Sequence, residues 1–188
     1  MELIMKKRSR YISFSTRSLL LLFVLIPFIV AGKPMAEYQV KAAFLQKFAD
    51  FVEWPADVVF NGSGPVRIGV FGSDPFGDLL PSDISEEDAG GVSYKVERIS
   101  SSEREFSRFH ILFVAETDPD LVVDLLEKIR GKPVLTVGEG ESFISQGGMI
   151  AFMLENNRVR FLVNLKSAMR ANLKISSKLL NLARFVTR

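Results

Sequence analysis

The apolar positions that open the folded part of the chain recur at helical spacing. Between Glu37 and Pro55, the side chains of Val40, Phe44 and Phe48 fall on one face of a helix, with polar residues between them. Because proline disfavours helical geometry in the residue before it, the helix is expected to end at Pro55. The segment predicts an amphipathic helix with this apolar face toward the core.

Short apolar segments further along the chain predict strands. Residues 66–71 fit a short strand, and residues 92–99 alternate apolar and polar side chains, as a half-buried or edge strand does. Residues 110–116 are almost continuously apolar, which suits a central strand covered on both faces. A helix over 118–129 separates this strand from the next, at 133–137. Strands that alternate with helices favour a largely parallel sheet.

The last third of the chain predicts a hairpin followed by a helix. One or two helical turns at 142–146 precede a strand at 149–154, a turn, and a second strand at 158–164. A long helix is expected over 165–185. Its inward side chains are expected to be Leu173, Leu179, Leu180 and Leu182. We predict an α/β fold, a three-layer sandwich with a mostly parallel sheet, helices on both faces and an antiparallel C-terminal edge hairpin.

Positive charge is concentrated at the N-terminus. Of the 24 Lys and Arg residues, six lie in residues 1–36, and of the 22 Asp and Glu residues only one does. Residues 37–188 therefore carry 18 basic and 21 acidic side chains. Nucleic-acid binding needs a clustered positive surface, and the mildly acidic folded part shows no basic run, so we do not expect a nucleic-acid partner.

Residues 1–36 have the organisation of an export signal. A basic start is followed by an apolar run from Leu19 that ends in small residues. An uncleaved membrane anchor is the alternative, but the unbroken apolar run has about 13 residues and a membrane span needs about 20. We predict a signal peptide over 1–36, cleaved after Ala31, Gly32 or Ala36, and a single domain over 37–188 without an integral membrane span.

The sequence gives little support for catalysis. It has no cysteine, which excludes thiol nucleophiles and thiolate metal sites, and its single histidine, His110, heads an apolar strand. Gly138 and Gly140 begin a dinucleotide-binding pattern, but Phe143 stands at the third glycine position and Glu139 would repel a phosphate. We expect no catalytic residues, no metal site and no cofactor, and we do not expect an enzyme.

Two sets of residues remain as candidates for binding. In an open α/β sheet, ligands tend to bind beyond the carboxyl ends of the strands. Here that rim is acidic and rich in small residues, which suits a cationic, zwitterionic or peptide-like ligand. Aromatic rings in or beside loops are candidates for contact with a partner protein. The rim residues are Gly72, Ser73, Asp74, Glu116, Gly138 and Glu139, and the loop phenylalanines are Phe60, Phe76 and Phe143.

Three segments of the chain are similar to those of a known family. The opening EYQVKAAFLQKFADFVEWP resembles its N-terminal signature, with Tyr38, Lys41 and Trp54 among the matching positions. HILFV, at 110–114, resembles its central strand, and the block 131–180 resembles its most recognisable part. By these segments the chain is identified as a member of the YfiR-like family of exported bacterial proteins.

This resemblance implies regulation rather than catalysis. YfiR-like proteins are periplasmic, and the namesake binds the periplasmic sensor domain of an inner-membrane diguanylate cyclase and holds it inactive, which limits cyclic-di-GMP and biofilm formation. The resemblance therefore implies a periplasmic regulator that acts by protein–protein interaction and forms a homodimer. A small-ligand-sensing domain that signals to a membrane histidine kinase is the alternative. Family members often have a cysteine where this chain has Phe109, so disulfide-based sensing is not carried over.

Overall fold

The computed structural model describes residues 32–56, 64–85, 91–100, 103 and 105–187. A short N-terminal unit, Met1–Met35, precedes the compact unit Ala36–Arg188, which contains every strand named below. The loop phenylalanine Phe60 lies outside the described residues.

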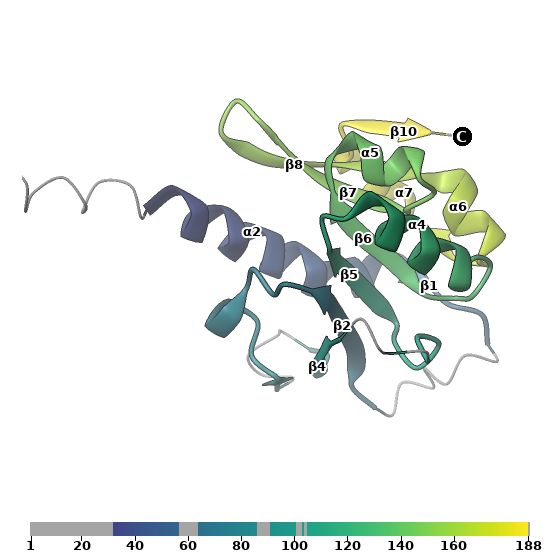
Figure 1. Ribbon diagram of the computed structural model, residues 1–188, viewed down its shortest axis with the longest axis horizontal. Coiled ribbons are helices and arrows are strands. Elements are labelled where there is room, and N and C mark those ends of the chain that lie inside the picture. Colours follow the sequence, from purple (N-terminus) through teal and green to yellow (C-terminus); the bar gives the residue numbers. More distant parts are fainter. Residues whose placement is uncertain (1–31, 57–63, 86–90, 101–102, 104, 188) are drawn as a thin grey trace, which may run out of the picture. The chain divides into compact units, whose positions relative to one another are not determined.

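An eight-stranded sheet forms the centre of the compact unit, with the strand order β10-β8-β7-β6-β5-β2-β4-β3 (Figure 1). Neighbouring strands are parallel except in the pairs β7–β8 and β3–β4. The predicted mostly parallel sheet is therefore confirmed. The strands are β2 (Val66–Gly72), β3 (Asp83–Ile84), β4 (Tyr94–Ile99), β5 (Ile111–Ala115), β6 (Leu135–Glu139), β7 (Ile150–Glu155), β8 (Arg158–Asn164) and β10 (Phe185–Thr187).

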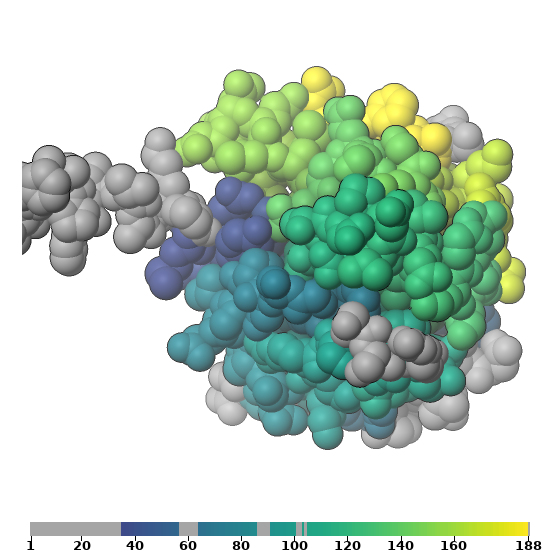
Figure 2. Space-filling model, viewed as in Figure 1, coloured from purple at the N-terminus to yellow at the C-terminus, as the bar shows by residue number. Residues whose placement is uncertain are grey.

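Helices cover both faces of this sheet, as predicted for a three-layer sandwich. Successive β5 side chains face opposite ways. Ile111 and Phe113 enter one apolar core and Leu112 the other, and all three are fully buried. The first core lies under α2, α6 and α7, and the second lies under α4 and α5, the helices nearest the viewer in Figures 1 and 2. The helices are α2 (Gly32–Phe48), α4 (Pro119–Lys128), α5 (Gly140–Ser145), α6 (Leu165–Arg170) and α7 (Ser177–Leu182).

The first helix packs on the sheet through aromatic rings. Phe44 and Phe48 of α2 contact Phe152 of β7 and Phe161 of β8, with ring centroids 5.5–6.1 Å apart. Each such ring pair contributes about 0.5–1.5 kcal/mol of stability beyond the contribution of the apolar area that it buries. These contacts confirm two of the three predicted inward positions, whereas Val40 is exposed.

The predicted end of this helix at Pro55 is wrong. α2 ends at Phe48, and a 3₁₀ turn (Ala49–Phe51) leads into a two-residue strand, β1 (Val52–Glu53). This strand pairs antiparallel with β9 (Lys174–Ile175). Pairing with a distant segment overrides the local helical pattern here, which a sequence period cannot reveal.

The predicted long helix over 165–185 is also wrong, because the chain turns twice within it. Asn172 adopts a left-handed conformation (φ 54°) and ends α6, and Ser176 then caps α7 by accepting a hydrogen bond from the Leu179 amide at 3.4 Å. Leu173 and Leu179 are buried as predicted, but Leu182 is exposed.

The predicted antiparallel hairpin is confirmed as β7 and β8. Its two-residue turn, Asn156-Asn157, has positive φ at both residues, the geometry of a tight hairpin turn. One detail was not foreseen. β10 pairs parallel to β8 on its outer side, so the hairpin is covered at its outer edge by one short strand.

Candidate functional site

A cavity of about 510 Å³ opens at the carboxyl ends of β2, β5 and β6, where ligands bind in open α/β sheets. Its wall combines apolar side chains with hydroxyl, amide and carboxylate groups, the mixture typical of small-molecule sites. The polar side chains that line it are Tyr38, Ser73, Glu116, Thr117, Glu139, Ser142 and Gln146, and the apolar ones include Pro75, Val114, Pro119, Val122 and Phe143.

The cavity gathers half of the predicted rim. Ser73, Glu116 and Glu139 line it. Gly72 lies beside them at a close backbone crossing, because a Cβ there would approach the Glu116 amide nitrogen to 2.9 Å. Its φ of 93° is a second reason for glycine at this position.

Asp74 and Gly138 serve the fold instead of lining the cavity. The Asp74 carboxylate accepts hydrogen bonds from the Phe76 amide at 2.8 Å and from the Arg98 side chain at 2.9 Å, so it holds a turn. Gly138 leaves room for the ring of Phe143, which would lie 2.6 Å from a Cβ at that position. The predicted site role of these two residues is not supported by their placement.

The two carboxylates of the cavity already accept hydrogen bonds. Glu116 Oε1 accepts from the amides of Thr117 at 2.7 Å and Asp118 at 3.0 Å. Glu139 Oε1 accepts from the Tyr38 hydroxyl at 3.1 Å and lies 3.0 Å from Lys41 Nζ. The rim is therefore less negative toward a ligand than its sequence suggests.

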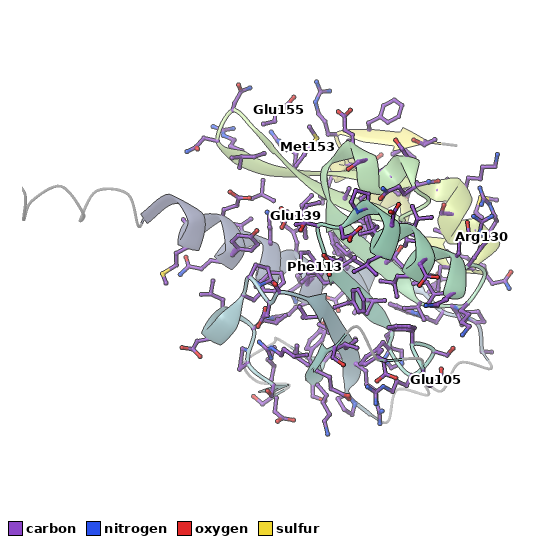
Figure 3. The ribbon with its side chains drawn as sticks, in the orientation of Figure 1. Glu105, Phe113, Arg130, Glu139, Met153 and Glu155 are labelled. Carbon is purple, nitrogen blue, oxygen red and sulfur yellow. The ribbon has the colours of Figure 1, made fainter. Side chains whose placement is uncertain are left out.

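Lys41 is a buried cation beneath this wall. Its side chain is 2% exposed, and Nζ lies 2.5 Å from the Glu37 carboxylate, 3.0 Å from that of Glu139 and 4.3 Å from the centroid of the Tyr38 ring. Burial acts to lower the lysine pKa, but the two carboxylates outweigh it, so the pKa of Lys41 is raised and the ammonium stays charged. Figure 3 labels Glu139, at the end of β6 on the side of α2.

Tyr38 shares this cluster. Burial, followed by the negative charge of Glu139, raises the pKa of its phenol, so the hydroxyl remains a hydrogen-bond donor. Sequence reasoning placed Lys41 on the polar side of the helix and did not recognise the cluster. One sequence feature does indicate that this lysine faces the core: Leu45 and Phe48 follow Lys41 at helical spacing, on the same side of the helix.

The two loop phenylalanines that the structure describes are buried and not presented on the surface as expected. Phe76 is 3% exposed and packs on Phe113, with ring centroids 4.8 Å apart, and Phe143 is the buried residue of α5, at 4% exposed. Rings beside loops fill the core here because the loops fold back over the sheet. Neither ring offers a free apolar surface to a partner.

A second concave surface lies between α2 and α7. It is an apolar groove of about 410 Å³, and its exposed wall includes Val40 and Leu182. We call it the α2–α7 groove. It is lined by Val40, Ala43, Phe44, Lys47, Phe48, Phe51, Leu179 and Leu182.

Within the described residues, no three His, Cys, Asp or Glu side chains gather as a metal site would require. Over that same part, no helix combines the length and apolarity that a membrane span demands.

Two solved structures share the fold. A conserved domain protein from Vibrio cholerae O1 biovar El Tor matches with a TM-score of 0.54 and 10% identity. The ABC domain in complex with L-Trp from Streptococcus pneumonia matches with a TM-score of 0.50 and 12% identity. Each match covers 80% of this chain and 60% of the solved one, so the chain spans well under the full length of these structures.

The family comparison is more specific. The model of a family described as YfiR/HmsC-like matches residues 38–184, which include the cavity, the buried lysine and the α2–α7 groove. Membership supports a periplasmic regulatory protein in general terms. This chain therefore belongs to the YfiR/HmsC-like family.

Proposed function

We propose that this protein is a periplasmic regulator that represses an inner-membrane diguanylate cyclase by binding its periplasmic sensor domain. Through this contact it would control cyclic-di-GMP signalling and biofilm formation. The observation that carries the proposal is the family match over 38–184, since the family is one of regulators rather than of enzymes. Export by a signal peptide in residues 1–36 and a homodimeric state are parts of the same proposal.

The α2–α7 groove is the surface that we assign to the sensor domain. Its walls are apolar, and an exposed apolar depression on a periplasmic protein favours contact with another protein. Val40 and Leu182 stand at its exposed wall, where an apolar side chain of the partner would bury them.

Deletion of the gene tests the repression. The deletion strain is expected to accumulate cyclic-di-GMP and to form more biofilm, and the wild-type gene is expected to reverse both effects. Unchanged cyclic-di-GMP after deletion would contradict the proposal.

A pair of variants tests the groove. Val40→Asp is expected to fail to restore repression in the deletion strain and to lose the sensor domain in a pull-down. Binding would remove water from the new carboxylate and give it no hydrogen-bond partner, which is unfavourable. The control is Val123→Asp on α4, whose side chain is similarly exposed (41% against 44%) but lies outside the groove. Equal behaviour of the two variants would remove the groove from the mechanism, and loss of a dimer in Val40→Asp alone would assign it to self-association.

The cavity supports a second candidate function. A pocket of this size and polarity at the sheet rim favours a small-ligand-sensing domain that signals to a membrane histidine kinase. The streptococcal domain is described in complex with L-Trp, so L-tryptophan is a reasonable first probe, with L-lysine as a cationic one. A ligand present at a hundred times its Kd should stabilise the protein by about 2.7 kcal/mol. Stabilisation that persists in Ser142→Leu, which narrows the cavity, would argue against this site.

A further inference from the structure

Charge is divided sharply within the folded part of the chain. Residues 156–188 contain eight Lys or Arg and no Asp or Glu. Since residues 37–188 hold 18 basic and 21 acidic side chains in total, residues 37–155 hold ten basic and 21 acidic ones. The small net charge of the domain conceals a basic C-terminal part and an acidic remainder.

This segment forms β8 and β10, at one edge of the large sheet, together with α6, β9 and α7. α6 packs against β9 and β10, and β10 lies along β8 (yellow-green to yellow in Figures 1 and 2). On α6, Lys166 and Arg170 are exposed one helical turn apart, and Lys178 is exposed on α7. Among the described residues, these three cations have no carboxylate within ion-pair distance.

Apolar side chains stand exposed among these cations. Met169, Leu182 and Phe185 each have more than half of their side-chain surface exposed. Lys174 lies in β9, between α6 and α7 in the sequence, and its side chain is 83% exposed. Its Nζ is 3.7 Å from the carboxylate of Glu53, which is 77% exposed, so this ion pair adds little stability. Leu182 also lines the α2–α7 groove and is therefore left out of the set that we call the C-terminal basic surface: Lys166, Met169, Arg170, Lys174, Lys178 and Phe185.

Three kinds of partner differ in how well they fit. A second copy in a two-fold contact would place like charges opposite one another, which is unfavourable. An acidic protein would pair with the cations but would gain less from the apolar side chains between them. An anionic phospholipid surface satisfies both, because its net negative charge attracts Lys and Arg while Met169 and Phe185 enter the headgroup boundary.

We propose that the C-terminal basic surface binds the anionic phospholipid surface of a membrane. This binding depends only on the charge of this chain and of the lipid. It is a property separate from the proposed repression of a sensor domain. In a periplasmic protein it concentrates the regulator at the bilayer that holds its target. The acidic remainder of the domain is repelled by the same lipids, so the bound protein is oriented as well as concentrated.

Vesicle co-sedimentation tests the inference. Protein isolated in its processed form from the periplasm of an expressing cell is mixed with vesicles of phosphatidylcholine alone or with 30% phosphatidylglycerol. Binding is expected only with the anionic lipid, and it should weaken as salt rises. Each Lys or Arg at an anionic surface strengthens binding about fivefold, so the triple variant Lys166→Gln, Arg170→Gln, Lys178→Gln should bind roughly a hundredfold more weakly.

A matched triple variant separates position from net charge. Arg67→Gln, Lys95→Gln, Lys128→Gln removes the same charge from exposed positions elsewhere and is expected to bind anionic vesicles as the wild type does. The proposal is overturned if the two triple variants bind equally, or if phosphatidylcholine vesicles bind as well as anionic ones. It is also overturned if the wild type binds neither kind of vesicle but captures an acidic protein in a pull-down, and the first triple variant no longer captures that protein. Repression lost in cells despite intact vesicle binding would contradict the proposed function and not this inference.

Discussion

At the scale of single residues, Lys41 links the first helix to the rim of the sheet. Its ammonium is almost completely buried, whereas its partners Glu37 and Glu139 keep 25% and 40% of their side-chain surface exposed. The carboxylates therefore remain partly hydrated. Removing the lysine should consequently lower the free energy of unfolding by less than breaking a fully buried ion pair does.

Replacement of Lys41 by methionine is expected to destabilise the fold by about 1–3 kcal/mol, because two carboxylates lose their cation. Urea unfolding measures the change. The control is Lys47→Met on the same helix, where the lysine is half exposed and pairs with Asp50 at 3.2 Å, and the change should stay within about 0.5 kcal/mol. Equal effects in the two variants would show that the buried pair has no special role.

His110 makes stability depend on pH. Its Nδ1 accepts a hydrogen bond from the Arg67 amide at 2.9 Å, which requires an unprotonated nitrogen. Burial, and next the charge of Arg67, lower the pKa of this imidazole. The unfolded chain therefore takes up a proton near the ordinary pKa of about 6.5, while the folded chain does not.

The free energy of unfolding should consequently fall as the pH drops from 7.5 to 5.5. His110→Asn keeps a hydrogen-bond acceptor without titrating there, so its stability should change less over this range. Unfolding in urea at the two pH values measures both slopes. The pKa of the Glu105 carboxyl is also lowered, so this group titrates below the ordinary glutamate range and does not affect the change in stability between pH 5.5 and 7.5. Parallel slopes for the two proteins would contradict the assignment.

At the scale of elements, the glycine-rich segment between β6 and β7 is packing rather than phosphate binding. Gly138 and Gly148 face the ring of Phe143 from two sides, and a Cβ at either position would overlap that ring. Gly138, which began the dinucleotide-binding pattern, and Gly148 instead let the Phe143 ring of α5 lie close on the sheet.

Gly148→Ala is expected to destabilise the protein by about 1–3 kcal/mol, because the ring of Phe143 must leave its position. Adding Phe143→Leu should recover part of the loss, which thermal or urea unfolding of the double variant would show. Gly64→Ala, where a Cβ meets nothing within 4 Å, is the control and should change stability by less than about 0.5 kcal/mol. A double variant no better than Gly148→Ala would remove the ring as the cause.

Elements with a complete local pattern could be predicted from the sequence. The helix over Pro119–Lys128 has an aspartate cap and an initial proline, and the β7–β8 hairpin has two asparagines at its turn. The break after Phe48 leads into β1, which pairs with β9, a contact between segments more than 100 positions apart, whereas the break after Arg170 has local signals in Asn172 and Ser176. No local period records such a contact.

At the scale of the whole molecule, the sequence predicted the layers, and three residues of the expected rim line the cavity, but the charge balance there was not predicted. Topology alone brings Ser73, Glu116 and Glu139 to one rim, so their meeting was predictable. The cation that balances Glu139 comes from Lys41, on a helix whose rotation about its axis was misjudged. The small net charge of the folded part conceals the basic C-terminal segment, which only a count by segment reveals.

Export should leave the Lys41 cluster intact. Cleavage after Ala31, Gly32 or Ala36 would give a mature chain that starts at or before Glu37, so all three predicted sites retain this partner of Lys41. The intact mass of protein purified from the periplasm measures the site. A mature chain that begins after Glu37, or an uncleaved one, would contradict the predicted signal peptide.

The ring contacts between the first helix and the hairpin strands also constrain the order of folding. Phe48 and Phe152 are 104 positions apart, so the ring contacts between α2 and the hairpin form only when most of the chain is available. A chain that crosses a membrane N-terminus first would expose this helix throughout its passage. These ring contacts therefore form late, after the strands of the hairpin have become available.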